Sequence, residues 1–156
     1  MKTLKFALAA ASVLPPLSAA SAQAPAPVDL DTVAPISGTW VYRSIGGGSE
    51  SDFIDASAAV RFKIRCDRAA RRVSISRMNV PAATASLSVW TTSLSRSLPA
   101  RFLPTKELVA DLSATDPLLD AIAFSRGRLA TAALGAPMVA VPAWPEIDRV
   151  VEDCRS

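Results

Sequence analysis

The side chains that could perform acid–base chemistry in this chain are carboxylates, because the sequence contains no histidine. This absence excludes Ser-His-Asp and Cys-His catalytic arrangements and zinc sites ligated by histidine. Two carboxylates across a cleft, one with a raised pKa, could still hydrolyse a glycan. Three acidic pairs lie close in sequence: Asp52 with Asp55, Asp116 with Asp120, and Glu152 with Asp153. We interpret each pair as a solvated surface or a helix cap, and we expect no enzyme, no cofactor and no metal site.

The two cysteines, Cys66 and Cys154, can form a disulfide if both point into the interior. Segment 58–66 (AAVRFKIRC) alternates apolar and basic residues, which is typical of a half-buried strand and gives Cys66 the inward parity of the apolar positions. Cys154 shares the apolar face of a helix predicted over the last segment. In an oxidising compartment, this arrangement predicts a Cys66–Cys154 disulfide that ties the helix to the sheet. Two free buried thiols are the alternative, whereas a redox pair would favour Cys-x-x-Cys spacing.

A cluster of basic residues is the candidate interaction surface. Seven basic residues and one acid lie between residues 61 and 77: Arg61, Lys63, Arg65, Arg68, Arg71, Arg72, Arg77 and Asp67. Strand parity places Arg61, Lys63 and Arg65 on one face, opposite the core, and Arg71 and Arg72 extend this patch near a hairpin turn. Such a row could bind lipopolysaccharide phosphates, peptidoglycan carboxylates or an acidic protein. The alternative is an edge hairpin whose charges are solvated and discourage aggregation.

The N-terminus has the layout of a secretory signal. Two lysines precede an apolar run over 6–14 that is too short to span a bilayer, and small residues follow. We predict cleavage after Ala22, because cleavage after Ala24 would leave the rigid Pro25 at the first position. An uncleaved anchor is the alternative. Cleavage removes two lysines and no acid, so the net charge falls from +3 to +1, and overall charge does not favour nucleic acid or membranes.

These segments predict an α+β domain with a hairpin-rich antiparallel sheet, a short helix and a C-terminal helix tied to the sheet by the disulfide. We expect a signal peptide over 1–22, a flexible Pro/Ala-rich lead-in over 23–35 and one domain over 36–156, without a transmembrane segment in the mature chain. Strands are predicted over 38–44, 58–66, 72–77, 87–92, 98–103, 108–112 (or a helical turn there), 128–134 and 137–141.

The sequence also predicts a glycine-rich loop and two helices. The glycine run at 46–49 predicts a hairpin loop. Asp116 and Pro117 are typical of a helix start, and Gly127 of its end. The final helix is predicted over 144–154, with Pro145 near its start and Trp144 on its apolar face and, like Trp40, in the core.

Three sequence segments also carry a resemblance to a known group. The string FKIRC, the segment DPLLDAIAFSRGRL and the ending PAWPEIDRVVEDCR together resemble an uncharacterised family of small exported proteins of Gram-negative bacteria. A strand ending in Arg-Cys and a C-terminal helix ending in Cys are more loosely similar to envelope accessory proteins associated with type VI secretion. The first resemblance implies export and the second a location in the cell envelope, and neither assigns a role to a residue.

We therefore expect a periplasmic or secreted, non-catalytic binding or accessory domain of the cell envelope. Its partner would be an acidic envelope protein or an anionic envelope polymer. Nucleic acid is not expected, because of the compartment and because exposed aromatic residues for base stacking are lacking. The alternatives are a hydrolase that uses acidic residues on cell-wall glycan and a purely structural envelope protein.

Overall fold

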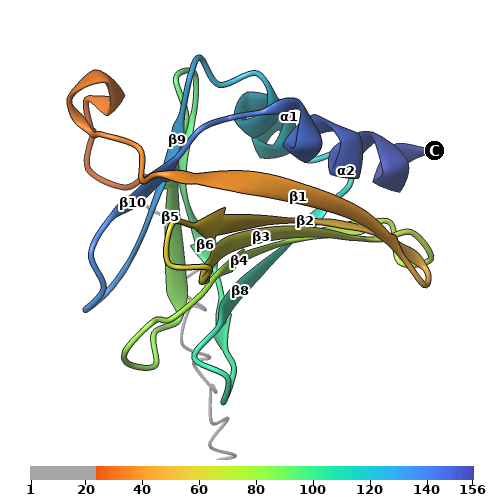
Figure 1. The fold of residues 1–156 in the computed structure, drawn as a ribbon, viewed down its shortest axis with the longest axis horizontal. Coiled ribbons are helices and arrows are strands. Elements are labelled where there is room, and N and C mark those ends of the chain that lie inside the picture. The colour runs from red at the N-terminus through yellow and green to blue at the C-terminus, as the bar shows by residue number, and fades with distance from the viewer. Residues whose placement is uncertain (1–23) are drawn as a thin grey trace, which may run out of the picture.

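The structure is a computed structural model that describes residues 24–156 (Figure 1). The predicted signal peptide and its cleavage site at Ala22 lie outside the described residues. Within residues 24–156, no helix has both the length and the apolarity needed to cross a bilayer.

A six-stranded antiparallel sheet, sheet A, forms the larger part of the fold. Its strands follow the order β1-β2-β3-β4-β8-β7. They are β1 (Gly38–Ile45), β2 (Gly48–Asp55), β3 (Val60–Asp67), β4 (Arg72–Arg77), β7 (Arg101–Phe102) and β8 (Leu108–Ser113). The alternation of apolar and basic residues in β3 and β4 gives the predicted hairpin, and segment 108–113 is a strand rather than a helical turn.

Strand β2 is the one element of sheet A that we did not predict. The glycine run predicts a loop over 46–49, but in the structure only Gly46 and Gly47 form the turn, where Gly47 has a φ of 84° that suits glycine. The strand that follows alternates serines with acidic residues, which are depleted in strands. Cations on both neighbouring strands pair with these acids, so tertiary contacts stabilise a sequence with low intrinsic strand propensity.

A second antiparallel sheet, sheet B, has the strand order β10-β9-β5-β6 and runs steeply across sheet A (Figure 1). Its strands are β5 (Ser86–Trp90), β6 (Ser95–Pro99), β9 (Leu129–Ala133) and β10 (Val139–Val141). The single strand predicted over 98–103 is divided between the sheets. Residues up to Pro99 belong to β6, and the chain then passes into sheet A as β7, with Ala100 between them.

The two helices lie on the same side of sheet A (Figure 1). Helix α1 (Pro117–Ala123) begins as predicted, with the Asp116 carboxylate accepting a hydrogen bond from the Leu118 amide at 2.9 Å. Helix α2 (Pro145–Arg155) buries Ile147, Val151 and Cys154 against the sheet. Cys154 is bonded to Cys66 of β3, with their Cα atoms 5.4 Å apart. The predicted α+β class and the disulfide are therefore confirmed.

The two tryptophans predicted to anchor the core have different environments. Trp40 is buried, and its ring meets those of Phe53 and Phe62 edge to face, with centroids 5.4 and 5.9 Å apart. The prediction for Trp144 is wrong, because this side chain is 40% exposed. Trp144 is the N-cap of α2 and has an extended backbone, so it lies outside the helical periodicity that we applied to it.

The segment predicted as a flexible lead-in packs against sheet B over the part that the structure describes. Residues 24–35 include one turn of 3₁₀-helix, η1 (Leu30–Thr32), and Leu30 is buried between this segment and the sheet. We call residues 24–35 the arm. The Pro/Ala-rich composition predicts a free segment. In the structure this segment instead packs against sheet B, because Leu30 is buried there.

Candidate functional site

The face of sheet A opposite α2 carries two rows of mostly polar side chains. Residues directly opposite one another in antiparallel strands point to the same face, so the strand register defines each row. The first row runs through Arg43, Glu50, Arg65, Ser74 and Asp111. The second runs through Val41, Asp52, Lys63, Ser76, Val109 and Arg101. We call this surface the open face.

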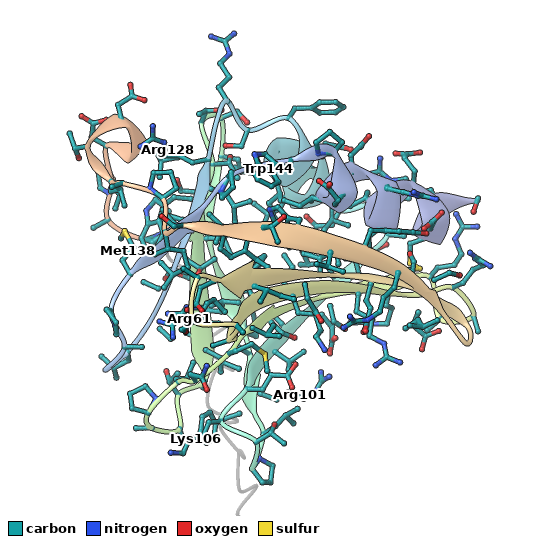
Figure 2. All side chains as sticks on the ribbon, in the orientation of Figure 1. Arg61, Arg101, Lys106, Arg128, Met138 and Trp144 are labelled. Carbon is teal, nitrogen blue, oxygen red and sulfur yellow. A yellow bond between two sulfur atoms is a disulfide. The ribbon has the colours of Figure 1, made fainter. Side chains whose placement is uncertain are left out.

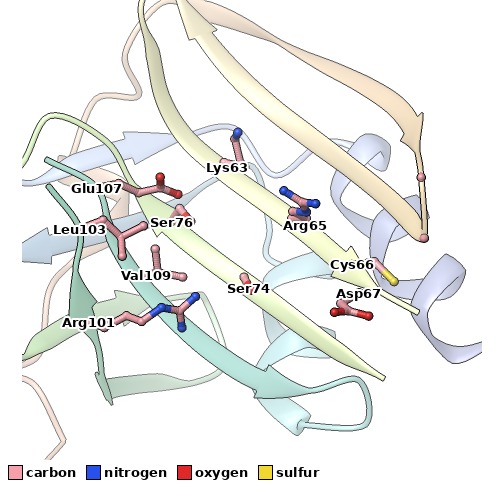
Figure 3. A pocket seen from close by; sticks show the side chains of 12 residues that line it. Lys63, Arg65, Cys66, Asp67, Ser74, Ser76, Arg101, Leu103, Glu107 and Val109 are labelled. Carbon is pink, nitrogen blue, oxygen red and sulfur yellow. The ribbon is translucent and has the colours of Figure 1, made fainter. Parts of the chain in front are cut away.

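A pocket of about 440 Å³ opens on this face (Figure 3). Three cations from two distant parts of the chain line it, namely Lys63, Arg65 and Arg101. The hydroxyl-bearing Ser74 and Ser76 lie between them on β4. Leu103, Val109 and Glu107 complete the wall next to β7, and the β1–β2 turn closes the opposite end. The pocket therefore combines cationic, hydroxyl and apolar surface.

Lys63 points to the open face as predicted, but it is paired there with acids of β2. Its ammonium nitrogen lies 3.6 Å from Asp52 Oδ1 and 3.9 Å from Glu50 Oε2. Arg43 binds the same two carboxylates from β1, with its Nε 2.6 Å from Glu50 Oε1. Burial alone would raise the pKa of Glu50, but the Arg43 hydrogen bond and the Lys63 charge lower it. This part of the open face is a charge-compensated ladder.

Arg61 is also paired within the protein. Its Nε lies 3.5 Å from Oδ2 of Asp55, at the end of β2, and it does not line the pocket. In Figure 2, Arg61 lies away from Arg128 and Trp144, which are on the helix side of the sheet. The acids of the unpredicted strand β2 thus compensate two of the three residues in the predicted row.

Arg65 is the exception in that row. Its side chain is exposed on the open face, opposite Glu50 on one side and Ser74 on the other. Among residues 24–156, no carboxylate forms an ion pair with it. Arg65 is therefore the cation of the pocket with the most capacity left for a ligand.

The turn residues of the hairpin do not form one patch with this pocket. Arg71 has a positive φ of 49°, and its Nη2 donates to the Arg155 carbonyl at the end of α2, at 3.2 Å. Arg72 points to the open face by register with Asp67, but it lines a separate depression beside Asp111. Of the five predicted ligand residues, the structure brings only Lys63 and Arg65 together in the pocket.

Two arginines, Arg101 and Arg77, have environments that we did not predict from the sequence. Arg101 lies far from the basic hairpin in sequence, but β7 pairs with β8 and brings it into the pocket, ion-paired with Asp111. Arg77 has the inward parity of Val73 and Ile75, and it is only 2% exposed. Parity alone could have identified Arg77 as buried, whereas Arg101 required the strand order.

The buried Arg77 is bound by backbone carbonyls. Its Nη1 donates to Met78 at 2.9 Å and to Arg61 at 3.2 Å, and its Nη2 donates to Pro137 at 3.4 Å. Burial, with a smaller effect of the Arg61 charge, lowers the pKa of Arg77 to about 10. The guanidinium is thus still charged at neutral pH and links β4 to the β9–β10 connection.

The acidic pairs are engaged in structural contacts. Asp116 caps α1 and binds Arg96 at 2.8 Å, and Asp120 binds Arg155 at 2.8 Å. Asp153 accepts a hydrogen bond from the Tyr42 hydroxyl at 2.7 Å; burial would raise its pKa, but this bond and neighbouring arginines lower it. A glycosidase acid needs a raised pKa, so the environment of Asp153 disfavours that role.

One remaining arrangement on the open face could suggest nucleophilic catalysis. Ser76 lies directly opposite Lys63, and both line the pocket. A lysine that activates a serine must act as a base toward its hydroxyl, whereas the Lys63 nitrogen is engaged here with two carboxylates. The arrangement therefore suits binding better than proton abstraction.

No protein-family model, curated protein or solved structure matches this chain. The resemblance to small exported proteins therefore stays a prediction.

Proposed function

We propose that this protein is a non-catalytic binding domain of the cell envelope, which binds an anionic group of an envelope polymer or protein in the open-face pocket. Arg65 is the principal ligand residue. Lys63 and Arg101 flank it, each ion-paired with carboxylates of the sheet, and the two serines offer hydroxyl hydrogen bonds. A periplasmic or secreted location is part of the proposal, and the disulfide supports it because such bonds persist in oxidising compartments.

The observation that carries this proposal is the difference between Arg65 and its neighbours. Each of the other two cations of the pocket has a carboxylate partner. Lys63 pairs with Asp52 and Glu50, and Arg101 pairs with Asp111. Arg65 is exposed and forms no ion pair within residues 24–156, although Glu50 lies directly opposite it and the Arg65 charge helps to lower the pKa of Glu50. A guanidinium offers planar paired donors that match a carboxylate or a phosphate, so an anionic ligand would supply the missing partner.

The surrounding charge limits which ligands fit. Glu107 and Asp67 also line the pocket, so the site is not uniformly positive. A ligand with one localised anionic group and polar or apolar neighbours suits it better than a densely charged polyanion. The apolar Leu103 and Val109 can contact the uncharged part of such a ligand.

The test is a charge reversal at Arg65. We expect Arg65→Glu to weaken binding to isolated peptidoglycan or to lipopolysaccharide by about tenfold or more, because a hydrogen bond to a charged group contributes about 1.5–3 kcal/mol. Binding is measured by co-sedimentation at two salt concentrations, and binding by the natural chain should weaken at higher salt. Reversal of Arg61 or Lys63 is less informative, because each is paired with an acid of β2.

The matched control is Arg126→Glu. Arg126 is exposed, lies outside this pocket and makes no side-chain ion pair within the described residues. This variant has the same change of net charge, so its binding should stay within about twofold of the natural chain. Equal loss in both variants would indicate a diffuse charge effect. Unchanged binding in Arg65→Glu, or no binding by the natural chain, would favour a purely structural role.

A further inference from the structure

Five charged residues line the open-face pocket, and they differ in how far the protein itself satisfies them. Lys63 and Arg101 form ion pairs, and Asp67 accepts a backbone hydrogen bond at 3.0 Å. Arg65 and Glu107 form neither an ion pair nor a side-chain hydrogen bond among residues 24–156. The pocket therefore presents one cation and one carboxylate whose polar atoms are available to a ligand.

Backbone contacts of the β7–β8 hairpin hold Glu107 in place. The Leu103 amide donates to the Glu107 carbonyl at 2.8 Å, and the amide of the buried Val80 donates to the Lys106 carbonyl at 2.9 Å. These bonds fix the main chain at the pocket wall, and the half-buried Glu107 side chain lines the pocket (Figure 3). None of them uses the carboxylate, so the fold itself gives no reason for an acid at this position.

A buried hydroxyl provides a second observation at the same site. Ser76 is only 3% exposed, and its side chain makes no hydrogen bond with the part of the chain that the structure describes. It lines the pocket, and in Figure 3 it lies between Glu107 and Arg65. Buried polar groups in folded proteins are almost always hydrogen-bonded. The partner of this hydroxyl must therefore come from whatever fills the pocket.

The strand register keeps Arg65 and Glu107 apart. Arg65 lies opposite Ser74, which lies opposite Asp111 of β8, and Glu107 precedes Asp111 by four residues along the chain. With about 4.8 Å between strands and about 3.3 Å per residue, the Cα atoms of Arg65 and Glu107 are on the order of 15 Å apart. A ligand that contacts both must therefore carry its two charged groups well separated. A free α-amino acid is too short, because its ammonium and carboxylate share one carbon.

We propose, building on the proposed function, that the ligand of the open-face pocket is a short extended peptide with a carboxylate and a primary ammonium group on different residues. The carboxylate binds Arg65, the ammonium group binds Glu107, and a polar backbone group between them binds the Ser76 hydroxyl. Leu103 and Val109 contact the alkyl part of the peptide. Glu107 disfavours a polyanion without ammonium groups, because such a ligand would place like charge beside it.

The test compares two synthetic dipeptides, N-acetyl-lysyl-alanine and the same dipeptide acetylated on the lysine side chain. Both have the terminal carboxylate, and only the first has the ammonium group. NMR titration of the natural chain at low salt should show binding of the first dipeptide about fivefold or more tightly than of the second. Glu107→Gln should remove this preference and leave the affinity for the acetylated dipeptide within about twofold. Equal affinities in the natural chain, or a preference that Glu107→Gln retains, would overturn the proposal.

The matched control is Glu152→Gln, the same substitution on α2, outside the pocket and on the other face of sheet A. This variant should keep the full preference for the ammonium dipeptide. Loss of the preference in both variants would indicate a general charge effect and contradict the role of Glu107. The comparison of the two dipeptides on the natural chain remains decisive if Glu107→Gln does not fold.

Two further measurements separate this ligand class from the proposed function and from a lipid headgroup. Arg65→Glu should weaken binding of both dipeptides, because both have the carboxylate. If it does so while the natural chain shows no preference between them, anion binding at Arg65 stands and the peptide with two charges is overturned. Glycerophosphoethanolamine carries both charges closer together than the dipeptide does. Tighter binding of this probe than of N-acetyl-lysyl-alanine would overturn the proposal in favour of a headgroup.

Discussion

Lys63 on β3 lies directly opposite Asp52 on β2, with its ammonium nitrogen 3.6 Å from Oδ1 of Asp52. Asp52 also binds Arg43 from β1, so one carboxylate that is 2% exposed lies between two cations. The basic hairpin is therefore not a row of unpaired cations. Of the seven basic residues in the hairpin, Lys63 belongs to this ladder and Arg61 pairs with Asp55, whereas Arg65 is left as the cation of the pocket without an ion pair in residues 24–156.

Because Asp52 belongs to this ladder, neutralising it should lower the free energy of unfolding more than neutralising the exposed Glu152. Asp52→Asn should lower the free energy of unfolding by about 1–3 kcal/mol, because it leaves two neighbouring cations without their buried partner. Glu152→Gln should change it by less than about 0.5 kcal/mol, since Glu152 forms an exposed helical pair with Arg155. Urea denaturation of both variants decides the matter, and equal costs would contradict the assigned role of the ladder.

Acid should destabilise the protein through Glu50. The Arg43 hydrogen bond and the Lys63 charge outweigh burial and lower the pKa of Glu50 in the folded state. A lowered folded pKa stabilises the protein above the ordinary value of about 4.3, and this contribution is lost as the pH falls through the folded pKa. Denaturation between pH 7 and pH 3 should therefore show a steeper loss for the natural chain than for Glu50→Gln. Parallel curves would show that Glu50 is not involved.

The Cys66–Cys154 bond should contribute strongly to stability. It joins positions separated by 88 residues and attaches α2 to the central strands of sheet A. We expect Cys66→Ser or Cys154→Ser to lower the free energy of unfolding by about 2–5 kcal/mol. Non-reducing peptide mapping of exported protein should find the two peptides joined. Two alkylatable thiols in that material would contradict the assignment.

Arg77 and Arg72 provide a matched comparison at the two ends of β4. Arg77→Ala should cost about 2–4 kcal/mol, because it opens a cavity and removes the donor to the Met78 carbonyl, whereas the Arg61 carbonyl keeps the bond from the Met78 amide. Arg72→Ala should cost less than about 1 kcal/mol, because Arg72 is exposed. Thermal and urea denaturation measure both effects, and a small cost at Arg77 would show that the buried cation is dispensable.

The sequence alone determined the features that depend on local periodicity. Side chains in a strand alternate between faces, so the spacing within segment 58–66 was enough to orient Cys66 inward and Arg61, Lys63 and Arg65 outward. Capping residues likewise located α1, and helical spacing placed Cys154 on the buried face of α2. The same parity, applied to β4, would have placed Arg77 inside the protein.

Tertiary structure decided the features that depend on which strands are neighbours. Strand β2 has weak propensity, and it exists because cations on β1 and β3 compensate its acids. Arg101 reaches the pocket only because β7 joins sheet A, and the arm is packed only because Leu30 meets Trp90. Pairing energies between segments distant in sequence cannot be read from the periodicity of either segment, so only the assembled sheets reveal the pocket and the packing of the arm.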